Sequence, residues 1–193
     1  MMPKMNPIAA AAALALLSPL AACSQSDNAS EADGPTTSAA NRTLAAAIGG
    51  APDLTTLSGA LSEAGLADIF DGPGSYTILA PDDGAFGSTD GETAALKDDA
   101  HRAELVAVLR GHILPGHLTL DAIRKAIADR KGPVTMTTLD DGEVTFSEVG
   151  GSVVVTGSDG SKATIEGDPL VASNGVVLPV DGFVKQPEVA PAA

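Results

Sequence analysis

The hydrophobic pattern changes period at Gly132-Pro133, and this change limits the folds that the chain can adopt. Before it, apolar residues recur three and four positions apart, as they do on one face of a helix. After it, they alternate with polar residues, as in strands with one buried face. Helices followed by antiparallel hairpins predict an α+β domain rather than repeated βαβ units. Three dipeptides typical of hairpin turns separate the alternating stretches: Asp141-Gly142, Gly150-Gly151 and Asp159-Gly160.

The same pattern predicts individual elements. Asp53 and Asp82 are placed to cap helices, because a carboxylate accepts hydrogen bonds from the free amides of a first turn. Pro179 cannot donate to a ladder, so the last strand either ends there or faces an edge. The expected helices cover 43–48, 54–64, 98–111 and 118–129, with a short one between Asp82 and Phe86. The expected strands cover 76–79, 134–138, 144–146, 153–155, 163–165 and 175–180.

The first 23 residues have the layout of an export signal. Lys4 supplies a positive charge, residues 8–17 form an uninterrupted apolar run, and small residues precede Cys23. The run is too short for a membrane-spanning helix, which needs about 20 apolar residues. Cys23 is the only cysteine, so internal disulfides and cysteine-based metal clusters are excluded.

Leu20-Ala21-Ala22-Cys23 resembles the lipobox of bacterial lipoproteins. The resemblance implies acyl chains such as palmitate on the Cys23 thiol, cleavage after Ala22 and a membrane anchor outside the cytoplasm. Ser24 then favours the outer membrane, and whether the domain faces the periplasm or the cell surface stays open. The alternative is an ordinary signal peptide followed by a chance cysteine. The predicted organisation is a signal peptide at 1–22, a flexible tether at 23–41, a folded domain at 42–185 and a disordered tail at 186–193.

Composition and motifs argue against several function classes. A formal net charge of −14 repels nucleic acid, and the absence of Trp argues against stacking on bases or sugars. The sequence contains neither a phosphate-binding loop nor a nucleophile elbow, so we expect no cofactor and no catalysis. His112 and His117 straddle a turn and are a conceivable metal pair, but no acidic residue lies beside them. Exposed turn histidines are the alternative, and we expect no metal site.

Three segments carry a family resemblance. Residues 76–86 read YTILAPDDGAF, residues 109–116 read LRGHILPG, and residues 173–177 read SNGVV, followed by Asp181. In this order and spacing they resemble the boxes YTVFAPTDxAF, LxxHxxPG and NGVxHxID of the fasciclin family. The resemblance covers about Thr43 to Val184. It implies a wedge of β-strands packed with helices, in agreement with the predicted α+β class.

The resemblance also selects candidate site residues, which either maintain the fold or touch a partner. Two departures matter. Gly111 replaces a tyrosine that, together with the following histidine, is linked to integrin binding in animal matrix relatives, so that role is not expected. Leu178 replaces a histidine of the closing strand. The candidate residues are Asp83, His112, Pro115, Gly116, Asn174 and Gly175.

Two binding functions and one catalytic function are compatible with these features. The anchor, the tether and the missing catalytic motifs favour a membrane-anchored binding or adhesion module, whose partner is a cell-envelope polymer or another protein. The alternative is a carrier of a small apolar ligand, since an aliphatic pocket can hold one. A hydrolase is the third hypothesis, and only labelling of an active serine would support it.

Overall fold

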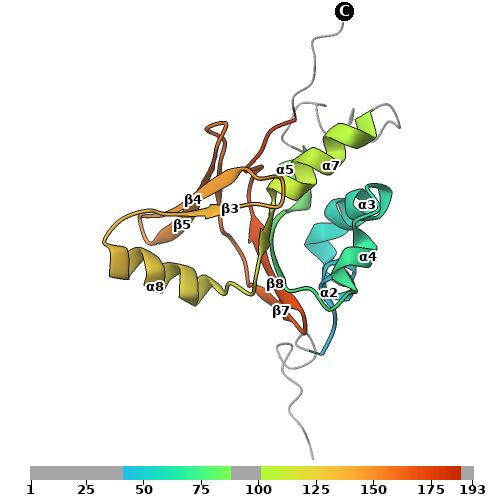
Figure 1. Ribbon diagram of the computed structural model, residues 1–193, viewed down its shortest axis with the longest axis horizontal. Coiled ribbons are helices and arrows are strands. Elements are labelled where there is room, and N and C mark those ends of the chain that lie inside the picture. Colours follow the sequence, from blue (N-terminus) through green and yellow to red (C-terminus); the bar gives the residue numbers. More distant parts are fainter. Residues whose placement is uncertain (1–40, 88–100, 188–193) are drawn as a thin grey trace, which may run out of the picture. The chain divides into compact units, whose positions relative to one another are not determined.

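The computed structural model describes residues 41–87 and 101–187, all of them within one compact unit. They form helices and two sheets, which confirms the α+β class (Figure 1). Several predicted features lie outside the described residues: the export signal, Cys23, most of the tether, the helix start at Asp98 and the tail beyond residue 187. The helical elements are α2 (Leu44–Gly49), the 3₁₀ turn η1 (Pro52–Leu54), α3 (Thr55–Glu63), α4 (Ala67–Phe70), α5 (Asp83–Gly87), α7 (Arg102–Gly111) and α8 (Leu120–Arg130).

Sheet A joins the middle and last thirds of the chain. Its strand order is β2-β1-β8-β7, with β1 parallel to β8 and the outer strands antiparallel to their neighbours. Tyr76 lies opposite Gly175 at one end of the parallel pair, and Pro81 lies opposite Val180 at the other. The strands are β1 (Tyr76–Pro81), β2 (Ile113–Pro115), β7 (Leu170–Ala172) and β8 (Gly175–Val180).

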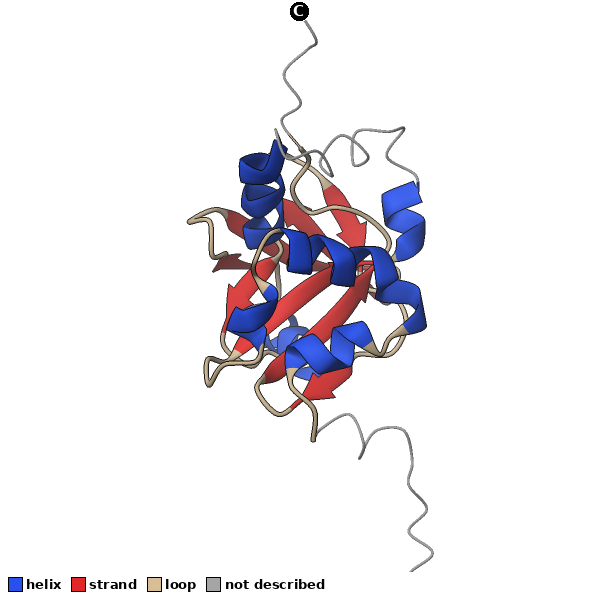
Figure 2. Cartoon of the chain, turned by 90° about the vertical axis from the view of Figure 1, so that its right-hand side faces the viewer, coloured by secondary structure: helices blue, strands red, loops and turns tan. Residues whose placement is uncertain are grey.

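Both faces of the two central strands of sheet A are covered. Ile78 and Val177 pack into a cluster with residues of α2, α3, α4 and α7. Leu79 and Leu178 pack into a second cluster with residues of α8 and of the other sheet. Figure 2 looks onto the helical side, with the strands behind the helices. Burial on both faces explains why these strands are continuous apolar runs and not alternating ones.

Sheet B is a meander of antiparallel strands in the order β3-β4-β5-β6. Val144 and Phe146 face the core, and Ile123 of α8 packs against this face. Gly150 and Gly151 form the β4–β5 turn with φ of 62° and 89°, the left-handed pair that a two-residue hairpin favours. The strands are β3 (Val134–Thr137), β4 (Glu143–Val149), β5 (Ser152–Gly157) and β6 (Lys162–Thr164).

Two features of sheet A differ from the sequence expectations. Strands β2 and β7 were not expected, because three residues are too few to show a period. The last strand continues through Pro179 to Val180 and does not end at the proline. The carbonyl of Pro179 accepts a hydrogen bond from the Glu166 amide at 2.9 Å, on the side away from β1. The proline nitrogen faces the same side, past the end of β7, where Ile165 pairs with Val180, so neither the predicted strand end nor an open edge lies at this position.

Candidate functional site

Asn174 connects the helical layer to sheet A. Its side-chain oxygen accepts a hydrogen bond from the Leu44 amide at 2.8 Å, where α2 begins. Its side-chain nitrogen donates to the carbonyls of Phe70 (2.6 Å) and Gly72 (3.1 Å), where α4 ends. One amide group therefore satisfies terminal groups of two helices, which otherwise lack partners within their own turns. Asn174 lies in the short turn before β8, and its side chain is part of the framework.

Gly175 is required by a close approach of two backbones. A β-carbon at this position would lie 2.0 Å from the carbonyl oxygen of Tyr76 and 2.7 Å from the Leu44 side chain. Real β-carbon contacts are never this short, so any larger residue would push β8 away from β1. Asn174 and Gly175 together fix the start of the last strand.

His112 is buried, with 1% of its surface exposed, at the C-terminal end of α7. Its Nδ1 lies 2.8 Å from the Val108 carbonyl oxygen, and its Nε2 lies 3.0 Å from the Val184 amide nitrogen. A carbonyl only accepts and an amide only donates, so the ring is neutral with its proton on Nδ1. Burial lowers the pKa of His112 to about 4, although the hydrogen bond to Val108 opposes this effect. The ring thus satisfies one carbonyl near the C-terminal end of α7.

The segment after β8 passes over His112 and is fastened on both sides. Phe183 makes edge-on ring contacts with His112 (5.4 Å between centroids) and with Phe86 of α5 (5.0 Å). Lys185 forms an ion pair with Asp140. We call residues 183–185 the C-terminal clasp. It covers the position where relatives carry a tyrosine, because a β-carbon at Gly111 would lie 2.6 Å from the Lys185 side chain.

His112 cannot form the conceivable metal pair, nor can its ring act as a general base in this state. Both ring nitrogens are occupied by backbone groups, whereas His117 is exposed. The alternative of two exposed turn histidines therefore holds for His117 and is wrong for His112. Among the described residues, no group of three or more metal-binding side chains is close enough to hold an ion.

Asp83 caps a helix that is distant in sequence. Its carboxylate accepts hydrogen bonds from the Thr55 hydroxyl at 2.6 Å and the Thr56 amide at 2.8 Å, at the start of α3. These bonds, that of Thr55 first, lower the pKa of Asp83. Asp53 was expected to cap this helix, but neither η1 nor α3 has a local side-chain cap. Asp82 caps α5 as expected, by accepting from the Ala85 amide at 2.6 Å.

Pro115 and Gly116 form the bend that leaves sheet A. Pro115 is exposed and ends the edge strand β2, where a missing amide proton is tolerated. Gly116 has φ of 97°, which a side chain would disfavour. The buried Thr77 hydroxyl holds the bend, because it donates to the Gly116 carbonyl and accepts from the Leu118 amide, both at 2.8 Å. Sequence reasoning missed Thr77, whose position inside an apolar strand was the available signal.

These motif residues do not form one site. Asn174 and Gly175 join α2 and α4 to sheet A, Asp83 caps α3, and His112 lies under the C-terminal clasp. Their polar atoms bond to the protein's own groups. Of the two interpretations of these residues, the structure supports maintenance of the fold, and a ligand site has to be sought elsewhere. Cys23, the predicted lipidation site, lies outside the described residues.

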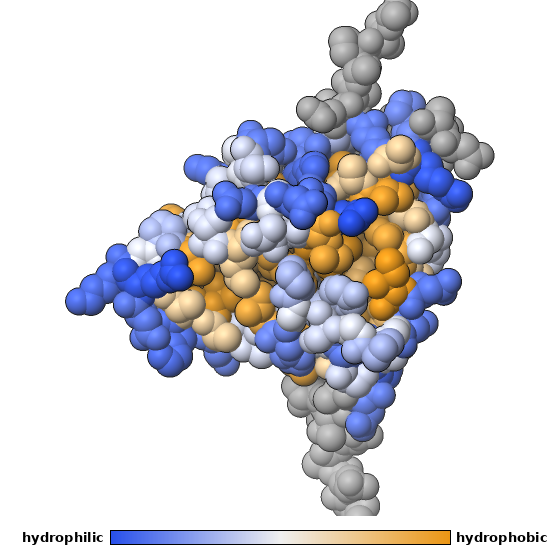
Figure 3. All heavy atoms as spheres, viewed as in Figure 1, coloured by the Kyte–Doolittle hydropathy of each residue, from blue (hydrophilic) through white to orange (hydrophobic). Residues whose placement is uncertain are grey.

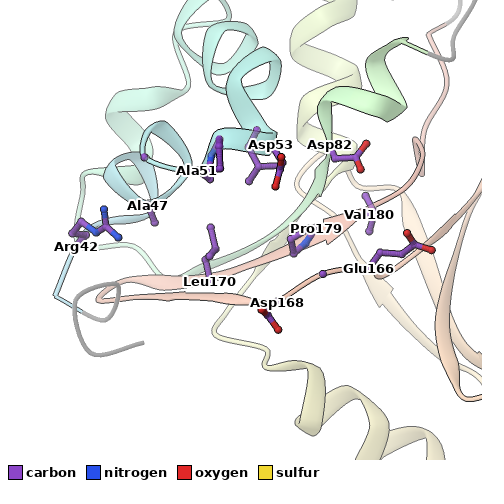
Figure 4. Close-up of a pocket in the computed structure, with 14 residues that line it drawn as sticks. Arg42, Ala47, Ala51, Asp53, Asp82, Glu166, Asp168, Leu170, Pro179 and Val180 are labelled. Carbon is purple, nitrogen blue, oxygen red and sulfur yellow. The ribbon is translucent and has the colours of Figure 1, made fainter. Parts of the chain in front are cut away.

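A pocket with apolar and charged lining residues opens beside Arg42, near the start of the described residues. We call it pocket 1, and its volume is about 530 Å³ (Figure 4). It lies between Arg42 and the α2–η1 connection on one side, and the end of β8 and the loop before β7 on the other. Apolar residues form part of its lining: Ala47, Leu54, Leu170, Pro179 and Val180.

Charged side chains of pocket 1 come from four separate segments. They were not singled out as a site from the sequence, because they share no motif and are brought together only by the fold. The four carboxylates each lie beside a proline or a glycine (Pro52, Pro81, Gly167), which was the weak signal available. A pocket of this size with an apolar lining and a few charged groups is the usual form of a small-ligand site. The charged side chains are Arg42, Asp53, Asp82, Glu166 and Asp168.

A second surface feature is visible on the face drawn in Figure 3. Apolar side chains appear in the strip between α8 and the α2–α4 helices, framed by polar ones. Exposed apolar surface of this kind is common at interaction sites. Pocket 1 is the better-defined candidate, because it is concave and its charges are of mixed sign.

Comparisons with known proteins agree on one family. The sequence model of the Fasciclin domain matches residues 52–185. Protein sll1483 of Synechocystis sp. is 25% identical over 147 residues, which cover 75% of this chain and 74% of that protein. The solved structure of a FAS1 domain pair from the insect cell adhesion molecule fasciclin I is similar, with a TM-score of 0.67 at 14% identity. The match covers 76% of this chain but only 52% of the domain pair, and at this identity it shows the fold alone.

Proposed function

Because this chain belongs to the fasciclin domain family, whose members are adhesion and binding modules, we propose that it is an exported, lipid-anchored binding module that holds its partner at pocket 1. The partner is a component of the cell envelope, either a polymer or another protein. The proposal assigns no catalysis to the chain. It is supported by His112, whose two ring nitrogens bond to backbone groups and are not available for acid–base chemistry.

Pocket 1 is the observation that carries this proposal. The family's motif residues are used to build the fold, whereas the charged residues that line pocket 1 lie on the surface of a rigid framework. Ligand sites on loops that a rigid scaffold positions are common, since the scaffold limits the entropy lost on binding. Arg42, which lines the pocket, directly follows the predicted tether, so the pocket would open near the point of attachment.

The anchor is proposed from the sequence. Leu20-Ala21-Ala22-Cys23 supports acylation of Cys23, and Ser24 supports sorting to the outer membrane. Several acyl chains hold a protein on a membrane stably, whereas one chain binds only marginally. Within the described ranges, no helix has the length and apolar character needed to cross a bilayer.

Two measurements test the proposal. Mass spectrometry of the membrane-extracted protein should show cleavage after Ala22 and acyl chains on Cys23, and Cys23→Ser should release the protein from membranes. A deletion strain should lose cell aggregation or surface attachment, and the wild-type gene should restore it. A gene carrying Asp53→Asn and Glu166→Gln should restore it less well. Unchanged attachment in the deletion strain would refute the adhesion function, and an unmodified thiol would refute the anchor.

A carrier of a small ligand is the second candidate. It is favoured by the apolar residues in the lining of pocket 1, among them Leu54, Leu170 and Val180. Native mass spectrometry of protein taken from its own membranes should then detect a bound small molecule. The Asp53→Asn and Glu166→Gln changes should reduce the amount of that molecule, since they alter only the wall of pocket 1.

A further inference from the structure

Pocket 1 has an uncompensated negative charge. Four carboxylates and one guanidinium line it, which gives a formal net charge of −3. Within residues 41–87 and 101–187, the side chains of Asp53, Glu166 and Asp168 have neither a hydrogen-bond nor an ion-pair partner. Asp82 keeps one oxygen on the Ala85 amide. Asp53, Glu166 and Asp168 are exposed to solvent, so a bound positive charge would gain only a modest attraction from each of them.

The charges are arranged unevenly around the pocket. In Figure 4, Arg42 lies at one end, and Asp53, Asp82 and Glu166 lie toward the other. No ion pair joins Arg42 to these carboxylates in the described part of the chain, so the guanidinium does not neutralise them. A cationic group would therefore bind at the acidic end, away from Arg42.

The surface between the two ends is apolar. Leu170 and Pro179 lie between Arg42 and the acidic end, with Ala47 on the opposite wall (Figure 4). A volume of about 530 Å³ accommodates a small organic group, either a free molecule or one exposed group of a larger envelope component. An apolar body that covers this surface would gain burial energy, in addition to the attraction of its charge.

We propose that pocket 1 selects a small amphiphilic cation, a molecule with an ammonium group at one end and an apolar body behind it. The inference rests on the proposed function, because it names the ligand class of the same pocket. The ammonium group lies among Asp53, Asp82 and Glu166, and the apolar body lies on Leu170 and Pro179.

A set of three probes with the same apolar body tests this inference. They are 4-phenylbutylammonium, 4-phenylbutanol and 5-phenylpentanoate, added to protein that carries Cys23→Ser and is therefore free of detergent. Backbone amide shifts of Gly167 and Leu170 report binding at the pocket. We expect the ammonium probe to bind about tenfold more tightly than the alcohol, and the carboxylate to bind least. Raising the salt from about 0.01 M to about 0.1 M should weaken binding of the ammonium probe and leave binding of the alcohol unchanged.

A matched pair of variants locates the effect. Glu166→Gln removes one charge from the pocket, and Glu148→Gln makes the same change on the exposed end of β4. Glu166→Gln should weaken the ammonium probe about threefold and leave the alcohol unchanged, a size typical of exposed charge pairs. Glu148→Gln should change neither.

The outcomes separate this inference from the proposed function. Equal binding of the ammonium and alcohol probes at pocket 1 would leave the binding site in place and refute selection for a cation. Tightest binding of the carboxylate probe would also refute it and would indicate Arg42 as the anchor. If none of the three probes shifts the amides of Gly167 and Leu170, pocket 1 is not a small-ligand site and the proposed site is wrong as well.

Discussion

Acidification from about pH 6.5 to about pH 4 should destabilise the domain through one side chain, His112. In the folded protein its pKa is about 4, whereas the ordinary value is 6.5, because burial disfavours the charged ring. A second proton on Nε2 would also point at the Val184 amide, which is itself a donor. At roughly 1.4 kcal/mol per pKa unit, this difference corresponds to about 3 kcal/mol of the free energy of unfolding. Total stabilities are only about 5–15 kcal/mol, so the effect is large.

The direction of the effect follows from proton binding. Between pH 6.5 and about 4, the unfolded chain binds a proton at this histidine and the folded chain does not. The free energy of unfolding therefore decreases as the pH decreases through this window. Above pH 6.5, the stabilisation that depends on a neutral His112 is fully present. The lowered pKa values of Asp83, Asp140 and Asp159 act in the same direction, but only below their ordinary value of 3.8. The two windows are thus separate.

Urea unfolding between pH 4 and pH 7.5 measures this dependence. His112→Gln cannot titrate and should lose most of the slope between pH 6.5 and 4, in addition to some stability at neutral pH. His117→Gln makes the same change at an exposed site and should keep the slope. In the wild-type protein, the ring proton signals of His112 should not titrate between pH 7.5 and about 5, a measurement that does not depend on whether a variant folds.

A slope that persists in His112→Gln and disappears in His117→Gln would refute the reasoning, since the titrating group would then be the exposed ring. A His112 signal that titrates near its ordinary pKa would also refute it. Either result would mean that the ring is hydrated in the folded state and that the C-terminal clasp does not seal it.

Three further predictions concern the framework and can be checked by urea unfolding at neutral pH. Asn174→Ala removes three hydrogen bonds and should cost about 2–4 kcal/mol; a loss below about 1 kcal/mol would show that water replaces the amide. Gly175→Ala should lower the free energy of unfolding by more than about 3 kcal/mol, because its β-carbon would meet a backbone carbonyl. Gly111→Ala should lower it by less than about 1 kcal/mol, because only the flexible Lys185 has to move. Equal losses in the two variants would contradict this distinction. Asp83→Ala should lower the free energy of unfolding by about 1–2 kcal/mol, because α3 loses its cap. Asp53→Ala should lower it by less than about 0.5 kcal/mol. The reverse order would show that Asp53 is the cap.

Local chemistry made much of the fold predictable. The hairpins of sheet B follow from alternation and from turns such as Gly150-Gly151, whose conformation is encoded in adjacent residues. The bend at Gly116 and the cap at Asp82 are local in the same sense. The three-residue strands β2 and β7 were not predictable in this way, because their strand conformation depends on the neighbours they pair with.

The candidate site was less predictable, because it depends on contacts between distant segments. The cap on α3 comes from Asp83, 27 residues after the amide that it accepts from, whereas the sequence pointed to the adjacent Asp53. His112 was placed correctly at a helix end, but its burial depends on Phe183, which no local pattern connects to it. Pocket 1 combines Asp53 and Glu166, and only the folded chain brings these carboxylates together.

The parallel pairing of β1 with β8 affects the order in which the chain can fold. Asn174 bonds to Leu44 across 130 residues, and Val184 bonds to His112 across 72. Contacts this far apart in sequence form slowly, since loop closure has to precede them. During synthesis the first helices and β1 must wait for the final strand before their core can close. Such delayed closure leaves the apolar faces of the earlier segments uncovered until β8 has been synthesised.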